Sequence, residues 1–143
     1  QALIGDGAGN IGWGDVASVG LQSRKTAQVT QSIASGAAAN VSISTAKGFV
    51  LYSIETSHAA WVTLYTDTTS RTADAGRLET TDPTPGSGVL SEVITTGAVT
   101  QLITPGTVCF NSSPTATTYA KVVNKGGSTA NVTVTLTYVQ IEN

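Results

Sequence analysis

Apolar and polar residues alternate with a period of two along most of this chain. The pattern is clearest over residues 132–138, where Val132, Val134, Leu136 and Tyr138 are separated by threonines. Side chains two residues apart lie on the same face of a β-strand, so this segment has one apolar and one polar face. Similar short segments recur from about residue 27, and no stretch of ten residues has a helical period. The sequence therefore predicts an all-β chain.

The composition supports strands and excludes several classes of function. Only 11% of the 143 residues are charged, against about 25% in a typical soluble domain, and Thr, Ser, Val and Gly are abundant. The net charge of -2 provides no broad cationic surface, so nucleic-acid binding is not expected. No apolar run approaches the roughly 18 to 20 residues that span a bilayer, so membrane insertion is not expected either.

Eight or nine short strands over residues 22–143 predict one antiparallel β-sandwich, most plausibly jelly-roll-like. The last two strands, at 119–123 and 132–138, are expected to form a hairpin, and Pro105-Gly106 is expected to form a turn. Strands that are apolar on both faces leave the choice of buried face open. The residues expected in the core are Val50, Tyr52, Val62, Leu64, Val122, Val134 and Leu136.

Residues 1–21 form a separate Gly-rich segment, with six glycines among the first twenty residues. Glycine at this density destabilises isolated regular structure, so we expect an extended arm or linker that is ordered by contact with something else. Leu3, Ile4, Ile11 and Trp13 have too few neighbours to be buried within one sandwich. We expect them to pack against other copies, as a homotrimer, or against another protein. Because the chain lacks Met, we also expect it to be a processed product or a piece of a longer protein.

Residues with catalytic or ligand-binding chemistry are few. Residues 7–12 match the dinucleotide fingerprint, but no helix is expected after them, so no cofactor is predicted. His58 is the only histidine, and no nucleophile elbow accompanies it and Glu55. Cys109 is the only cysteine and is expected to be a small buried hydrophobe. Four loop carboxylates match no calcium-loop spacing, so neither a metal site nor an enzyme is predicted.

The longest stretch without a period is residues 67–88. Loops longer than about 12 to 15 residues in a compact domain are usually functional or disordered. We expect this loop to be an exposed contact surface, shaped by its prolines, in which charges can be replaced without loss of the fold. The expected contact residues are Asp67, Arg71, Asp74, Arg77 and Asp82.

The Gly-rich leader at 3–14, followed by a Thr/Ser/Val-rich sandwich of low charge, resembles the terminal domains of tailed-bacteriophage virion proteins. Residues 61–67 and 119–124 are similar to stretches in structural proteins of phages that infect cyanobacteria. The resemblance implies a virion component that is assembled in the host cytoplasm, either a fibre or spike tip or a capsid decoration protein. Members of either kind are commonly trimeric. The resemblance transfers no binding residue.

These observations together predict a non-enzymatic structural or adhesion domain. The first hypothesis is the terminal domain of a phage tail fibre or spike, which makes weak, multivalent contacts to host-surface glycan. A capsid decoration protein that contacts neighbouring virion proteins is the alternative. A carbohydrate-binding module of a larger enzyme is a further alternative.

Overall fold

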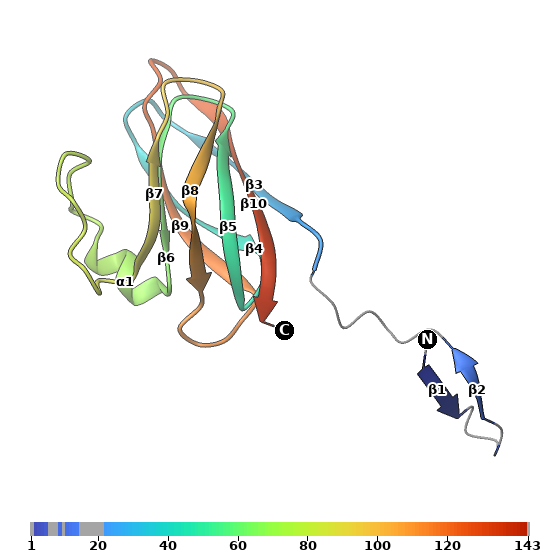
Figure 1. Ribbon diagram of the computed structural model, residues 1–143. Coiled ribbons are helices and arrows are strands. Elements are labelled where there is room, and N and C mark those ends of the chain that lie inside the picture. The colour runs from blue at the N-terminus through green and yellow to red at the C-terminus, as the bar shows by residue number, and fades with distance from the viewer. Residues whose placement is uncertain (1, 6–8, 10, 15–21, 143) are drawn as a thin grey trace.

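The structure is a computed structural model that describes residues 2–5, 9, 11–14 and 22–142. Two four-stranded antiparallel sheets pack face to face, in the orders β3-β10-β5-β8 and β4-β9-β6-β7 (Figure 1). The eight strands are β3 (Lys25–Ile33), β4 (Ala38–Ser44), β5 (Gly48–Thr56), β6 (Ala60–Tyr65), β7 (Val89–Ile94), β8 (Val99–Phe110), β9 (Thr117–Asn124) and β10 (Ala130–Glu142).

This strand order is that of a jelly roll, so the predicted all-β sandwich is confirmed. The predicted hairpin of β9 and β10 is wrong, because the two strands lie in different sheets. Asn124, fully buried at the end of β9, holds this crossover: its amide donates to the carbonyl oxygens of Ile33 and Ser128, at 2.8 and 2.9 Å. The expected turn residues are present between β9 and β10, but they connect one sheet to the other.

The core lies between the two sheets. Val62, Leu64, Val122, Val134 and Leu136 are buried there, as predicted. Val50 and Tyr52 are not core residues: Tyr52 is 36% exposed, while Phe49 and Leu51 occupy the interior instead. Strand β5 is apolar on both faces, and a shift of one residue exchanges the face that is buried.

Strand β8 is longer than the sequence indicates. The expected turn at Pro105-Gly106 is wrong, because both residues lie within β8, where the Thr104–Pro105 peptide bond is cis. β8 is at the edge of its sheet. The absence of a backbone N–H at Pro105 therefore does not remove a hydrogen bond from the interior of the sheet.

The N-terminal segment contains a two-stranded antiparallel hairpin, β1 (Ala2–Gly5) and β2 (Ile11–Gly14), with Leu3 opposite Trp13. The expected extended arm therefore includes local strand pairing. Apart from Gly9, the other residues of this segment lie outside the described part, as do the side chains of Leu3, Ile4, Ile11 and Trp13. The role of these side chains in assembly therefore stays a prediction. Among the described residues, no helix is long and apolar enough to cross a membrane.

Candidate functional site

The loop between β6 and β7, residues 66–88, lies beside the β4-β9-β6-β7 sheet (Figure 1). It begins with a short helix, α1 (Thr68–Ala73), which the aperiodic sequence did not predict. Asp67 caps this helix: its Oδ1 accepts a hydrogen bond from the Ser70 backbone N–H at 2.7 Å. The Ser70 amide, followed by the Ser112 hydroxyl, lowers the Asp67 pKa to about 2. Asp67 is thus a structural cap that ties the start of the loop to the sandwich.

Arg71 attaches α1 to the sheet. Its Nη1 donates to the carbonyl oxygen of Val41 at 2.9 Å and, more weakly, to that of Ala120 at 3.4 Å. The guanidinium carbon lies 5.5 Å from the centroid of the Tyr119 ring. Arg71 therefore contacts β4 and β9 rather than projecting into solvent.

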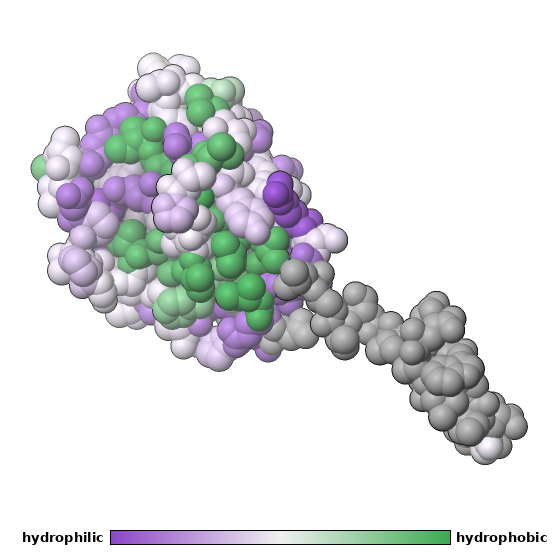
Figure 2. All heavy atoms as spheres, in the orientation of Figure 1, coloured by the Kyte–Doolittle hydropathy of each residue, from purple (hydrophilic) through white to green (hydrophobic). Residues whose placement is uncertain are grey.

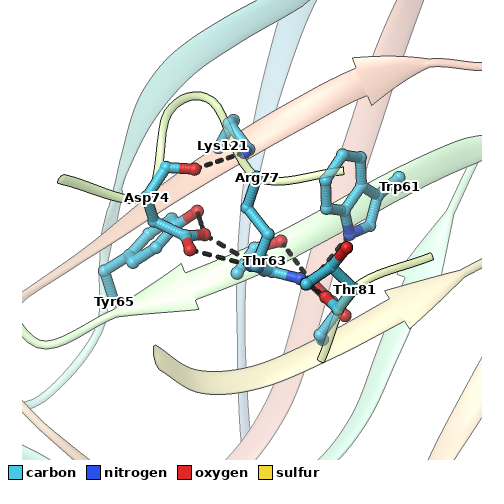
Figure 3. Close-up of polar contacts among 8 residues, drawn as sticks. Trp61, Thr63, Tyr65, Asp74, Arg77, Thr81 and Lys121 are labelled. Carbon is cyan, nitrogen blue, oxygen red and sulfur yellow. Dashed lines mark hydrogen bonds and ion pairs between the residues drawn. The ribbon is translucent and has the colours of Figure 1, made fainter. Parts of the chain in front are cut away.

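A cluster of polar side chains lies between the loop and the outer face of the sheet, and Figure 3 shows it. Strand β6 supplies Trp61, Thr63 and Tyr65, which alternate with its core residues. Glu92 of β7 and Lys121 of β9 lie opposite Thr63, one on each side. We call these five residues, with Asp74 and Arg77 of the loop, the charge cluster.

Arg77 is the centre of the charge cluster. Its Nε donates to Asp74 Oδ1 at 2.8 Å, and its Nη2 donates to Glu92 Oε2 at 2.5 Å. Its Nη1 donates to the carbonyl oxygen of Thr81 at 2.9 Å. The side chains of Arg77 and Asp74 are only 8% and 9% exposed. One guanidinium therefore joins two parts of the loop to strand β7 through charge-assisted hydrogen bonds.

Both carboxylates of the charge cluster are held in the ionised form. Burial opposes ionisation of Glu92, but hydrogen bonds from Arg77, from Trp61 Nε1 at 2.8 Å and from Thr63 outweigh it and lower its pKa. Burial likewise opposes ionisation of Asp74, and hydrogen bonds from Arg77 and from the Tyr65 hydroxyl at 2.7 Å lower its pKa. The same contacts leave neither carboxylate free to act as a general base.

Lys121 supplies the second cation of the charge cluster. The residue is 4% exposed, and its Nζ donates to the backbone oxygen of Asp74 at 3.2 Å. Nζ also lies 4.5 Å from the centroid of the Trp61 ring, and the Arg77 guanidinium carbon lies 5.4 Å from it. Burial lowers the Lys121 pKa, and the Asp74 charge opposes that shift. Two cations and two carboxylates balance, so the charge cluster works as a clamp on the loop.

The structure corrects the expectation that the five predicted contact residues are exposed. Asp74 and Arg77 are buried in the charge cluster, Asp67 is a helix cap, and Arg71 contacts the sheet. Only Asp82 is exposed as expected. The sequence of an aperiodic loop shows which charged residues the loop contains. It does not show that residues of a neighbouring sheet are their partners. A lysine at position 121, within a central apolar strand, was the one signal that a covering segment with carboxylates lies above it.

We define the tip of the loop as residues 78–86, most of which are exposed. Leu78 is 67% exposed, and Glu79 forms an ion pair with Lys125 of the β9–β10 turn. Below the tip lies a crevice of about 320 Å³, lined by Ser70, Ala73, Asp74, Arg77, Thr81, Asp82, Thr84 and Ser87. The buried Ser87 hydroxyl has no hydrogen-bond partner among the described residues. Most lining residues are Ser, Thr, Asp or Arg, but their apolar atoms form more of the crevice surface than their polar atoms do.

The other candidates do not form a catalytic arrangement within the described part. The Ser57 hydroxyl lies 2.8 Å from His58 Nδ1 in an exposed turn, but Glu55 accepts a hydrogen bond from Thr100 instead. Cys109 is buried, as predicted, and burial raises its pKa to about 12. No group of three or more His, Cys, Asp or Glu in the described ranges is placed to hold a metal ion.

Comparison of the chain with protein-family models, with curated proteins and with solved structures finds no match.

Proposed function

We propose that this chain is a non-enzymatic structural and adhesion domain of a virion, the terminal domain of a tailed-phage fibre or spike. In this proposal, the tip of the 66–88 loop contacts host-surface glycan, and several copies act together, as in a homotrimer. The resemblance of the sequence supports the virion part of the proposal. The single observation that supports contact through the loop is the buried charge cluster, which fixes the base of the loop on the sheet.

A loop that is ordered before it binds loses less conformational entropy on binding. The clamp orders residues 74–81, and Pro83 and Pro85 restrict the backbone of the exposed tip. The tip is therefore a better contact surface than a free loop of the same length would be.

The crevice below the tip fits the chemistry of a sugar. The hydroxyl groups of Thr81 and Thr84 can donate and accept hydrogen bonds, and the exposed Asp82 carboxylate accepts them. No aromatic side chain lines the crevice, so stacking on a sugar ring is absent from this contact. Affinity per copy is therefore low, and useful binding comes from several copies.

Capsid decoration is the second candidate. The observation that favours it is the exposure of large apolar side chains such as Val108 and Phe110 on the sheet opposite the loop. Such residues suit a permanent partner better than a hydrated glycan.

The test compares binding of the biotinylated full chain, displayed on streptavidin, to cyanobacterial cells and to isolated phage heads. The tip variant is Asp82→Ala with Thr84→Ala. The matched control is Glu55→Ala with Thr100→Ala, an exposed acid and threonine away from the loop. We expect the tip variant alone to lose cell binding, and periodate oxidation of the cell surface to abolish it. Cell binding that survives both treatments would overturn the glycan proposal. Retained binding to heads only would favour decoration.

A further inference from the structure

The outer face of the β3-β10-β5-β8 sheet carries a continuous group of apolar side chains, which we call the apolar face. Its members are Val50, Tyr52, Val108, Phe110, Val139 and Ile141. Figure 2 shows a broad green area over the lower ends of β8, β5 and β10. Val108, Ile141 and Phe110 are 59%, 58% and 49% exposed. A contiguous exposed apolar patch of this kind is often a functional surface.

The register of the strands makes the apolar face continuous. Val50 of β5 lies opposite Val108 of β8 on one side and opposite Val139 of β10 on the other. Next to this row, a Cβ atom at Gly106 would lie 3.1 Å from Val50 Cγ1 and 3.7 Å from Tyr52 Cδ1. No side chain rises from the sheet at Gly106, so the surface there is low.

The two outer faces of the sandwich differ in what covers them. The loop and the charge cluster cover the β4-β9-β6-β7 sheet, whereas no described element packs over the apolar face (Figure 1). Charged groups lie at its rim, where Arg24 stacks on Tyr52 at 5.0 Å and Lys25 donates to Gln140. Glu142, at the end of β10, adds a carboxylate. Two such faces can therefore meet without facing like charges at their centres.

The size of the apolar face suits a contact between copies. The exposed fractions of its side chains give the apolar face an area on the order of 400 Å², within the range of about 300 to 600 Å² for the largest apolar patch on a typical monomer. A stable interface needs about 800 Å² from each partner, of which about 65% is apolar in homodimers. With a polar rim of similar area, the apolar face reaches about 800 Å² per partner. Its apolar share of about half is nearer to the roughly 56–58% of a non-obligate interface than to the roughly 65% of homodimers.

We propose that the apolar face packs against the apolar face of a second copy of this chain. The same surface is used on both copies, so the contact closes at two copies and is a different association from the homotrimer. It lies on the sheet opposite the loop, so both loop tips stay exposed. The inference concerns association alone and does not depend on what the tip binds. It is also distinct from the predicted role of the N-terminal arm, because it places the contact on β5, β8 and β10.

The test measures the mass of the full chain by light scattering over a wide range of dilution. One variant is Val108→Lys, which puts a charge at the centre of the face. The second is Val108→Thr with Ile141→Thr, which keeps β-branched side chains and so keeps strand propensity. The matched control is Leu102→Thr, on the same strand but lining the cavity between β7 and β8 and 64% exposed. Circular dichroism checks that each variant is folded.

We expect the native chain and Leu102→Thr to associate, Val108→Lys to be monomeric, and the double variant to associate about tenfold or more weakly. A monomeric native chain at high concentration would overturn the proposal. So would an oligomer whose mass is unchanged in both face variants, since its contact would then lie elsewhere, for instance in the arm. Equal loss of association in Leu102→Thr would also count against the apolar face as the interface.

Discussion

Replacing Arg77 by Met should destabilise the loop strongly, because it removes the cation that serves both carboxylates of the charge cluster. The Met side chain fills similar space over Trp61 but leaves Asp74 and Glu92 without their guanidinium partner. Loss of one partner from a buried ion pair costs about 3 to 5 kcal/mol. The Glu92 side chain is 20% exposed, so partial hydration places the expected cost near the lower end, about 3 kcal/mol.

The assay combines urea unfolding with hydrogen exchange of the amides of α1 and residues 74–81. A local loss of about 3 kcal/mol corresponds to exchange on the order of a hundredfold faster in this segment. The matched control is Lys125→Met, which removes the exposed ion pair with Glu79 and should cost less than about 1 kcal/mol. The reasoning would be refuted if Arg77→Met cost no more than Lys125→Met.

Two further predictions follow from the loop. The pKa values of Asp74 and Glu92 are lowered in the folded state, so their contribution to stability is complete above the ordinary carboxylate range and is lost as the pH falls through their folded values. Thermal melts between neutral and acidic pH should therefore show a smaller loss in Asp74→Asn/Glu92→Gln than in the native chain, and equal slopes would contradict this. Gly88→Ala should cost more than about 1 kcal/mol, because Gly88 has φ +88° and its Cβ would lie 2.1 Å from Ser70 Oγ. The control Gly76→Ala, where a Cβ meets nothing within 4 Å, should be near neutral in the same urea titration.

The sequence predicted the fold class well because strand periodicity is a local property. Leu136 is placed correctly because threonines occupy the other face of β10. Val62 and Leu64 are also placed correctly, although all six residues of β6 are buried. Val50 and Tyr52 were placed on the wrong face because β5 is apolar on both sides. The outward-facing apolar residues of β5 belong to the apolar face. The wrong prediction and the exposed apolar surface therefore have the same cause, which is a strand that is apolar on both sides.

The candidate site was predicted only in part, because its partners are distant in the sequence. The 67–88 stretch was correctly singled out as a distinct loop, and its charged residues were named. Neither Glu92 nor Lys121 was among them, although each lies opposite Thr63. Glu92 supplies one of the two negative charges of the charge cluster, and Lys121 supplies one of the two positive charges. Strand register across three strands brings these residues together, and register depends on tertiary structure that no local pattern contains.

The position of β10 between β3 and β5 has a consequence for how the sandwich folds. Strand β3 pairs only with β10 in its sheet, although about a hundred residues separate them in the chain. Before β10 is in place, β3 has no ladder partner and β5 has β8 alone. During synthesis, that sheet therefore forms only after residues 130–142 have left the ribosome. Proteins that depend on pairing between distant strands typically fold slowly. Until β10 is in place, the unpaired edges of the apolar strands are exposed and prone to aggregation.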